Sequence, residues 1–315
     1  MHKHCLLHGL KSKKQLISML DITDNKVMKG KAQDKIKIYI ATEPKKRLIE
    51  APEYKIKKVQ NKIKNYLLKC DLPSYVFSGI KGKSYFCNAA LHRDCKFLYK
   101  TDISAFFPSI SRNTAYKFFK NDLETSSDVA KILTDICTVD IRDTLEKDSS
   151  VAGFVKDKKI KMYNHLCTGS PASPILSYLV NKAMFDEMYA IAENNNLKFS
   201  IYMDDVFFSS SKSISNNVRE HILRILTKYG YNVSFKKVIY YTSQQNKKVT
   251  GVIITPQNKL SIPNKLRRKI IASFSKGNLK TGEQNLRGML VASNIIEKNS
   301  FSGIKRYLNE LSKIQ

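Results

Sequence analysis

The chain has 315 residues, of which 42% are hydrophobic, and its 55 lysines and arginines against 27 aspartates and glutamates give a formal net charge of +28. A chain of this hydrophobic content can bury a core in two or three sub-domains, and this charge predicts a polyanionic partner, nucleic acid ahead of a membrane surface. No apolar run approaches about 18 residues and the N-terminus has no signal-peptide core, so we expect a cytosolic protein without a spanning helix.

The cysteines and the N-terminal histidines are the first candidates for metal chemistry. The six cysteines form no C-x-x-C pair, so we expect reduced thiols rather than a structural zinc site. Four residues near the N-terminus could cluster on a metal ion, although a frayed, polar chain end is the favoured interpretation. They are His2, His4, Cys5 and His8.

The first elements are a basic, irregular segment and a pair of strands. Residues 1–35 are basic, with a short helix expected at 11–20. KIKIYIATEPKKRLIEAP (35–52) predicts a strand, a turn at Glu43–Pro44 and a second strand that ends at Pro52.

A lysine-rich amphipathic helix is predicted at residues 53–69. One face carries six lysines, which favours a surface that meets phosphates, although a solvated face or a membrane-surface helix would have the same pattern. The opposite face is an apolar stripe of Ile56, Val59, Ile63 and Leu67.

The middle of the chain begins with a strand and ends with a long helix. KFLYKTDISAFFPSI (96–110) begins as a strand that leads directly into Asp102. The segment 113–165 is mixed, and its polar stretch KDSSVAGFVKDKKIK predicts a loop or a small hairpin. A helix then runs from the Gly-Ser-Pro turn, with Pro174 in its first turn, to Asn194–Asn196.

IYMDDVFFSS (201–210) predicts a hairpin whose tip carries two adjacent aspartates. Phe199, Ile201 and Met203 alternate with polar residues as in a strand, and an apolar strand follows the pair. Asp is a common turn residue, and a turn is the simplest interpretation of the pair alone. Adjacent carboxylates repel, however, so holding both ionised favours a hard divalent cation between them.

The C-terminal third predicts helices around short strands. An amphipathic helix is expected at 216–229, and short strands at 231–241, 248–254 and 259–262. Three helical segments close the chain, near 263–275, 282–297 and 301–313.

This order of elements predicts a small α+β sheet backed by helices. Asp102 at the end of one strand and Asp204–Asp205 at the hairpin tip could then meet on neighbouring strands. Three carboxylates at one edge could hold two Mg²⁺ ions about 4 Å apart for an in-line phosphoryl displacement.

Several motifs, in the family's order, resemble those of reverse transcriptases. Y-M-D-D after a strand and T-D-I-S-A-F-F-P-S upstream are similar to the family's palm motifs. KKRLIEAP with the lysine helix, YVFSGIKGKSYFCNAALH, LCTGSPASPILSYLVN, GYNVSFKKV and KKVTGVII resemble its other motifs in the same order, across residues 36–262. N-A-A-L-H (88–92) and V-T-G (249–251) are similar to signatures of the retron branch.

The resemblance implies a right-hand polymerase, with an antiparallel palm sheet backed by helices, fingers and a helical thumb. It divides the chain into a basic N-terminal extension (1–35), fingers (36–95 and 120–164), palm (96–119 and 165–262) and thumb (263–315).

The resemblance also implies an activity and its partners. Retron enzymes bind their own structured non-coding RNA, extend DNA from the 2′-OH of an internal guanosine with dNTPs, and make a branched product, msDNA. They act in the bacterial cytoplasm in defence against phage, with a separate effector protein. The cognate RNA, the effector and the oligomeric state are outside what the sequence determines.

Residue roles follow motif by motif from the resemblance. Asp102, Asp204 and Asp205 are expected to be catalytic and to hold two Mg²⁺ ions, with Ile103 offering a backbone carbonyl. The incoming nucleotide is expected to meet Arg47, Phe107, Thr168, Gly169 and Lys237. RNA or primer contacts are expected at Asn88, His92, Met203, Thr250, Gly251, Lys265, Arg267 and Arg268, although Asn88 and His92 could equally be a structural pair.

The chain departs from the family's pattern at three positions. Thr168 replaces a common Gln near the nucleotide sugar, Ala105 replaces a common acid, and Met203 replaces an Ala frequent in retrons. The alternatives are an abortive-infection or diversity-generating reverse transcriptase and, outside enzymes, an RNA-binding scaffold, against which the three intact aspartates argue.

Overall fold

The computed structural model describes residues 2–28, 32–43, 45–233, 235–275 and 279–314, and it is a mixture of helices and sheets. The strands within each sheet pair antiparallel, which confirms the predicted α+β class. No helix in these ranges is long and apolar enough to cross a bilayer.

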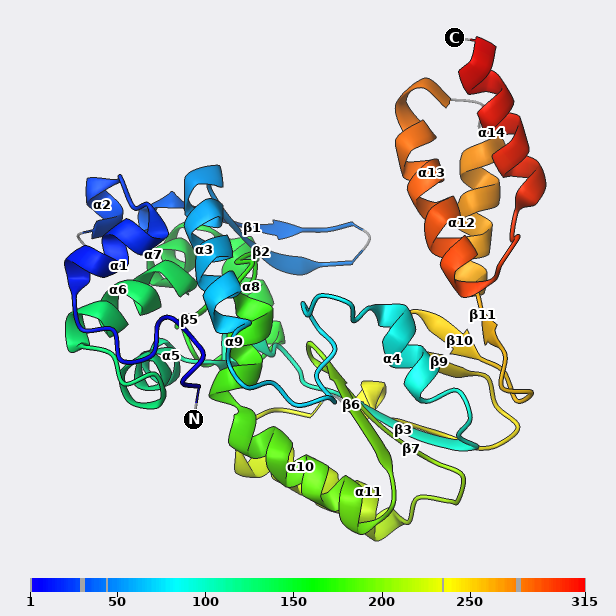
Figure 1. The fold of residues 1–315 in the computed structure, drawn as a ribbon, viewed down its shortest axis with the longest axis horizontal. Coiled ribbons are helices and arrows are strands. Elements are labelled where there is room, and N and C mark those ends of the chain that lie inside the picture. The colour runs from blue at the N-terminus through cyan, green and yellow to red at the C-terminus, as the bar shows by residue number, and fades with distance from the viewer. Residues whose placement is uncertain (1, 29–31, 44, 234, 276–278, 315) are drawn as a thin grey trace.

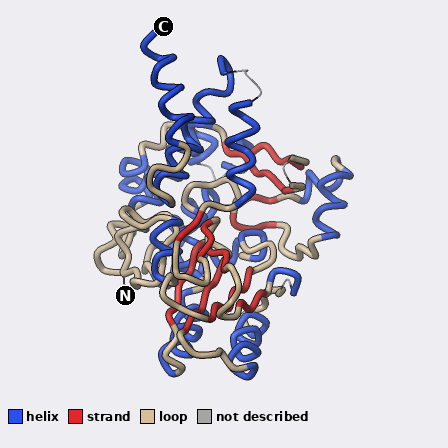
Figure 2. The backbone as a smooth tube through the Cα atoms, turned by 90° about the vertical axis from the view of Figure 1, so that its right-hand side faces the viewer, coloured by secondary structure: helices blue, strands red, loops and turns tan. Residues whose placement is uncertain are grey.

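A four-stranded sheet lies at the centre of the fold. Its order is β6-β7-β3-β8, with every neighbouring pair antiparallel. Figure 1 shows it in the lower middle of the molecule, and Figure 2 shows the strands gathered into one block from the side. The strands are β3 (Phe97–Asp102), β6 (Lys198–Tyr202), β7 (Asp205–Ser210) and β8 (Ile239–Tyr241).

Both faces of this sheet are covered, so β7 is buried on both sides. Val206 and Phe208 face a core that includes residues of α10 (Lys182–Asn194) and α11 (Asn216–Lys228). Phe207, which points the other way, packs in a second core with residues of the small sheet and α4. These elements are α4 (Tyr85–Leu91), β9 (Lys247–Val249), β10 (Val252–Ile254) and β11 (Leu260–Ser261).

The lysine-rich helix α3 (Tyr54–Leu67) follows a β-hairpin, as predicted. The hairpin pairs β1 (Ile36–Ala41) with β2 (Arg47–Pro52). Ala41 and Arg47 are the cross-strand partners next to the turn. The predicted apolar stripe of α3 is buried, with exposed fractions between 0% and 8%, which confirms its direction. The lysines of α3 lie on the opposite, more exposed side.

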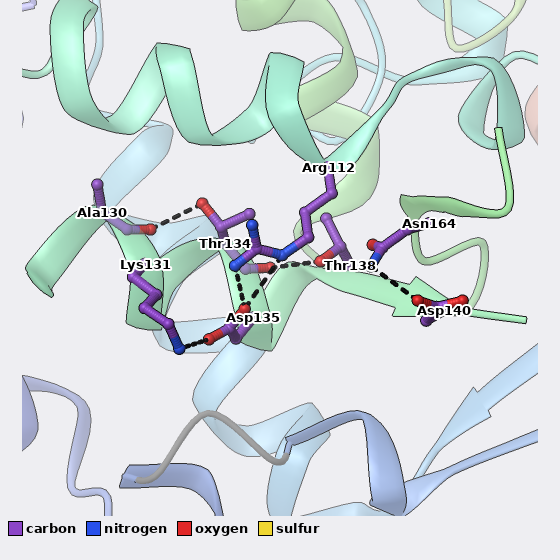
Figure 3. A network of polar contacts seen from close by, with 8 residues as sticks. All are labelled: Arg112, Ala130, Lys131, Thr134, Asp135, Thr138, Asp140 and Asn164. Carbon is purple, nitrogen blue, oxygen red and sulfur yellow. Dashed lines mark hydrogen bonds and ion pairs between the residues drawn. The ribbon is translucent and has the colours of Figure 1, made fainter. Parts of the chain in front are cut away.

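A polar network joins the helices beside α3 to a two-stranded sheet (Figure 3). Arg112 pairs with Asp135, which also accepts a hydrogen bond from Lys131 at 3.0 Å. Asn164 donates to Asp140 across the sheet at 3.2 Å. The elements concerned are α5 (Arg112–Lys117), α6 (Ser127–Cys137), β4 (Thr138–Asp140) and β5 (Asn164–Leu166).

The N-terminal segment packs into the core, so the expectation of a frayed end is wrong. His2 and Cys5 are 3% and 2% exposed, and Leu7 is fully buried. The amide of Gly9 donates to the carbonyl of Leu123 at 2.8 Å. Apolar side chains in this segment anchor it despite its basic composition. The helices that follow are α1 (Lys13–Leu20), α2 (Asn25–Met28) and the short η1 (Ala32–Lys35).

The polar stretch predicted as a loop forms a helix, α8 (Ser149–Asp157), after α7 (Arg142–Lys147). The carboxylate of Asp148 caps α8 by accepting from the amides of Ser150 and Val151. Val151, Phe154 and Val155 bury one face at helical spacing, a pattern that the surrounding lysines obscure in the sequence.

The single long helix expected up to Asn194–Asn196 is broken into α9 (Ser173–Val180) and α10. Asn181 lies at the break, and its side chain donates to the carbonyl of Ser177 at 2.9 Å and accepts from the hydroxyl of Tyr231 at 2.7 Å. An Asn side chain that bonds nearby groups favours such an interruption. The strands expected at 231–241 are likewise reduced to β8, because η4 (Phe235–Lys237) is a 3₁₀ turn.

Three helices at the C-terminus form a group of their own, seen at the upper right of Figure 1. They pack around a separate small core that includes Ile270, Leu286 and Leu308. They are α12 (Asn264–Ser275), α13 (Leu279–Ile296) and α14 (Ser302–Ile314), close to the three predicted segments.

Candidate active site

The three aspartates meet at one edge of the central sheet. β3 ends at Asp102 and β7 begins at Asp205, and these two residues are cross-strand partners. Asp204 lies in the two-residue turn that joins β6 to β7. Its carbonyl accepts a hydrogen bond from the amide of Ile103 at 3.0 Å, which ties the turn to the end of β3. The structure therefore brings together carboxylates more than a hundred residues apart.

The turn that carries Asp204 is strained. Met203 has a φ of 56°, in the left-handed region that an unbranched side chain adopts only at a cost of roughly 1–2 kcal/mol. The corresponding turn between β9 and β10 contains Thr250, with a φ of 44°, and Gly251, with a φ of 88°. The hydroxyl of Thr250 donates to the carbonyl of Tyr85 at 2.7 Å, which helps to hold that turn. Both strained turns face one cavity, and strain of this kind clusters at functional sites.

Two lysines pair with the aspartates. The ammonium of Lys100 lies 2.7 Å from a carboxylate oxygen of Asp205, and that of Lys237 lies 2.5 Å from one of Asp102. The Asp102 side chain is only 9% exposed, so its charge depends on such a partner. Lys237 was expected on a strand and instead lies on the 3₁₀ turn η4, from which its side chain reaches Asp102.

The crowding of carboxylates changes their ionisation. Burial, then the charges of Asp102 and Asp205, raise the pKa of Asp204 to about 6. Burial also raises the pKa of Asp205, against the opposing effect of the Lys100 charge. A cation among these groups would stabilise the ionised carboxylates, because its charge offsets both the cost of burying them and their mutual repulsion.

The donor set fits a hard divalent cation. Carboxylate oxygens are the ligands that such ions take, and the pKa of Asp204 is raised by burial and then by the like charges of Asp102 and Asp205, which a cation would offset. As the side chains stand, no group of three or more His, Cys, Asp or Glu within the described residues is arranged to hold an ion. Asp102 and Asp205 are turned toward lysines instead.

Two adjoining cavities of about 630 Å³ each open beside the aspartates. Arg47, Asp204 and Lys237 line both of them, and Thr168 lines the first. Both cavities are strongly basic. The second is also lined by Asp102, Asp205, Met203, Thr250 and Gly251. Most of the residues expected to contact the nucleotide or primer end are thus gathered at one place.

Other expected site residues lie outside the described lining of these cavities. Phe107 is half-buried on the short η2 (Phe107–Ser109), whereas Phe106 is 4% exposed and packs against Phe185 and Tyr231. Neither ring lies on a strand, because β3 ends at Asp102.

Gly169 is required by the chain itself. A Cβ at this position would lie 1.9 Å from the backbone carbonyl oxygen of Glu50. The absence of a Cβ at Gly169 is therefore required by the close approach of β2.

Direct RNA contact by Asn88 and His92 is contradicted, because both side chains are completely buried. The ring nitrogens of His92 hydrogen-bond the hydroxyls of Ser209 and Ser200 at 2.6 and 2.8 Å. Burial lowers the pKa of His92 to about 3, so the ring is neutral. His92 instead fastens the end of α4 to the central sheet.

The basic residues of α12 are divided between internal and exposed positions. The Nη2 of Arg267 donates to both carboxylate oxygens of Glu297, at 2.7 and 2.5 Å, and its Nε donates to the carbonyl of Ile262. Lys265 and Arg268 are exposed. Arg267 thus holds the small sheet against the end of α13, whereas the side chains of Lys265 and Arg268 are open to a polyanion.

Sequence reasoning missed several residues of the site. Lys100 pairs with Asp205, and Lys45 and Lys158 line the first cavity. Alternation along β3 places Lys100 on the same side as Asp102, and this signal was available in the sequence. The buried pair of Glu50 and His165 was also missed, because 115 residues separate its members.

An antiparallel sheet that gathers three carboxylates beside a basic cavity is an arrangement suited to nucleotidyl transfer on nucleic acid. The chain belongs to the reverse transcriptase (RNA-dependent DNA polymerase) family, whose model matches residues 33–254. It is therefore an RNA-directed DNA polymerase.

Relatives of the chain include retron reverse transcriptases. It is 25% identical over 254 residues to the Retron Ec83 reverse transcriptase of Escherichia coli, covering 78% of this chain and 77% of that protein. It is 25% identical over 279 residues to the Retron Ec86 enzyme of E. coli, covering 86% and 78%. It is 27% identical over 194 residues to the Retron Se72 enzyme of Salmonella heidelberg (strain 579083-10), covering 60% and 44%. These similarities agree with the resemblance seen in its motifs.

Proposed function

We propose that the protein binds its own structured non-coding RNA, starts DNA synthesis from the 2′-OH of an internal guanosine and makes branched msDNA as part of a retron anti-phage system. The observation that carries this proposal is the cluster of Asp102, Asp204 and Asp205 beside basic cavities, in a chain whose relatives are retron enzymes. The bacterial cytoplasm and a separate effector protein belong to the same proposal.

The fold supports a division into three parts around the aspartates. We assign the central sheet with α10 and α11 to the palm, the β1–β2 hairpin with its neighbouring helices to the fingers, and α12–α14 to the thumb. We assign the described part of residues 1–35 to the fingers, because the thiol of Cys5 donates to the carbonyl of Tyr66 on α3 and the Tyr66 hydroxyl donates to the carbonyl of Met19.

We assign the three aspartates to two Mg²⁺ ions, with the carbonyl of Ile103 as a further oxygen ligand. Bound Mg²⁺ lowers the pKa of an attacking hydroxyl and neutralises charge on the phosphates. The protein's own contribution is to fix three carboxylates at one sheet edge. Lys100 and Lys237, which pair with two of them, are placed to exchange partners when substrate phosphates enter.

The first cavity suits the incoming nucleotide. Arg47 offers a planar, multidentate hold on a triphosphate, and Lys237 offers a point charge. Thr168 lines this cavity and Gly169 follows it on the same loop, and Phe107, which lies outside the lining, is assigned to the deoxyribose from its motif alone. Met203, Thr250 and Gly251 are assigned to the primer end, and Lys265 and Arg268 to the hybrid.

The test uses the RNA of the protein's own locus. Methylation of the 2′-OH of the priming guanosine should stop initiation, while RNA affinity and extension of an added DNA primer remain. Normal product from the methylated RNA would contradict retron priming and favour an abortive-infection or diversity-generating enzyme. Loss of primer extension by the unmodified complex would instead favour an RNA-binding scaffold.

A further inference from the structure

A buried acid–base pair joins the strand that carries Arg47 to the loop beneath the first cavity. Glu50 on β2 and His165 on β5 are both 0% exposed, and their side chains are 2.7 Å apart. Burying an ion pair costs several kcal/mol of desolvation, which a well-packed apolar pair of similar volume would avoid. Stability alone is therefore a weak reason for its presence.

Both carboxylate oxygens of Glu50 and both ring nitrogens of His165 have a hydrogen-bond partner. One oxygen of Glu50 bonds the Nε2 of His165, and the other accepts from the backbone amide of Thr168 at 2.7 Å. The Nδ1 of His165 bonds the carbonyl of Met162 at 2.5 Å. The pair thus spans from β2 through β5 to the first residue of the Thr168–Gly169 loop.

The backbone of Glu50 presses on the same loop. Its carbonyl oxygen leaves no room for a Cβ at Gly169, at 1.9 Å, and accepts from the Sγ of Cys167 at 3.7 Å. Arg47 lies three residues earlier on β2 and lines the first cavity together with Thr168. A slip of the loop along β2 would therefore change the spacing of Arg47 and Thr168.

We propose that Glu50 and His165 are positioning residues that fix the Thr168–Gly169 loop relative to Arg47 and so set the affinity for the incoming nucleotide. This inference rests on the proposed nucleotide site. Neither residue contacts the cavity, so the pair acts through the loop.

The pair makes this positioning depend on protonation. Both ring nitrogens of His165 face acceptors, so with Glu50 ionised the ring must carry both protons. Burial by itself lowers the pKa of His165, but the hydrogen bond and charge of Glu50, the Met162 carbonyl and the charge of Asp140 outweigh it, and the pKa is raised. Asp140 on β4 is itself paired with Arg142.

The raised pKa of His165 determines the direction of the pH dependence. The stabilisation is complete below the ordinary pKa of His, about 6.5, and is lost as the pH rises through the higher pKa of His165 in the folded protein. Cys167, whose thiol donates to the carbonyl of Glu50, is a further titratable group beside the pair, and burial raises its pKa. The KM for dNTP should therefore rise at alkaline pH.

Glu50→Gln separates geometry from charge. The Gln amide can accept from Thr168 and donate to a neutral His165 that keeps its bond to Met162, so all three bonds survive without a titrating ion pair. We expect a dNTP KM within about twofold of wild type at neutral pH and no alkaline rise. Glu50→Ala leaves the amide of Thr168 without its hydrogen-bond acceptor. We therefore expect a dNTP KM about tenfold higher, with kcat changed much less.

The assay is steady-state incorporation of dTTP on poly(rA)·oligo(dT) by the full chain from pH 6.5 to 9.5, with thermal unfolding of each variant. Asp135→Asn is the matched control, because it breaks an ion pair with Arg112 in the same region away from the loop. It should lower Tm and leave KM unchanged.

Two outcomes overturn the inference. One is a Glu50→Ala variant that loses Tm as the control does while its KM is unchanged. The other is an alkaline rise in KM that persists in Glu50→Gln. This second test can be made even if Glu50→Ala does not fold. Arg47→Ala separates the two proposals, because an unchanged KM in that variant would overturn the nucleotide site itself.

Discussion

Replacing Asp204 by Asn should abolish DNA synthesis and, at neutral pH without divalent metal, make the protein more stable. The pKa of Asp204 is raised from its ordinary value of 3.8 to about 6 by burial and by its two acidic neighbours. A displacement of about two units corresponds to at most on the order of 3 kcal/mol of unfavourable free energy when the group is ionised. Asparagine has similar shape and no charge, so this cost disappears.

The pH dependence of the gain follows from proton linkage. Between pH 3.8 and about 6 the folded wild-type protein binds more protons at Asp204 than the unfolded chain, so its stability falls as the pH rises through this window. The advantage of Asp204→Asn should therefore be near zero below pH 3.8 and largest above about pH 6.

The assay is urea unfolding of both proteins in EDTA at pH 4.5 and pH 7.5, followed by titration with Mg²⁺. Added Mg²⁺ should stabilise wild type and have a much smaller effect on Asp204→Asn, because the ion relieves the same repulsion. An equal stability difference at both pH values, or a variant less stable than wild type at pH 7.5, would refute this account of the carboxylates.

Three further predictions concern the nucleotide, the RNA and the sheet. Phe107→Val should relax the dGTP/GTP ratio of kcat/KM by about 10–200-fold, whereas Phe106→Val should cost roughly 1 kcal/mol or more of stability and leave the ratio unchanged; the reverse result would contradict the assignment of the two rings. Affinity for unrelated RNA should fall on the order of a thousandfold or more between 50 and 200 mM salt if about eight phosphates are contacted, with a smaller loss for cognate RNA; equal competition by unrelated RNA at 200 mM would exclude a dedicated partner. His92→Ala should lower stability by about 1–3 kcal/mol by stranding two serine hydroxyls while leaving RNA affinity unchanged, and a specific loss of RNA affinity in a stable variant would restore a direct contact.

Helices and strands with one buried face were predicted from the spacing of their apolar residues. The α3 stripe from Ile56 to Leu67 and the strands around Asp204–Asp205 were predicted because burial on one face leaves a regular spacing in the sequence. The helix α8 was missed because lysines surround its apolar face, and the Asn181 break because its cause is a tertiary bond to Tyr231.

The aspartates of the site could be predicted because they lie at the ends of strands. The pairing of side chains from distant parts of the chain could not be predicted. Asp102 and Asp205 end and begin strands that a simple sheet brings together. Glu50 and His165 have no local pattern that relates them, since their pairing depends on how β2 and β5 pack. The expectation of a frayed N-terminus is wrong, because Cys5 and Leu7 are buried. The histidines and lysines around them give the segment a polar composition that does not indicate this burial.

The most direct test of the central claim is incorporation of labelled dNTP on a primed RNA template by wild type and Asp205→Asn, with RNA affinity measured on the same preparations. Synthesis depends on three carboxylates, whereas RNA binding depends on many of the 55 lysines and arginines. We predict that Asp205→Asn loses synthesis and binds RNA within about twofold of wild type. Incorporation by Asp205→Asn at a rate close to wild type would contradict the assignment of the active site.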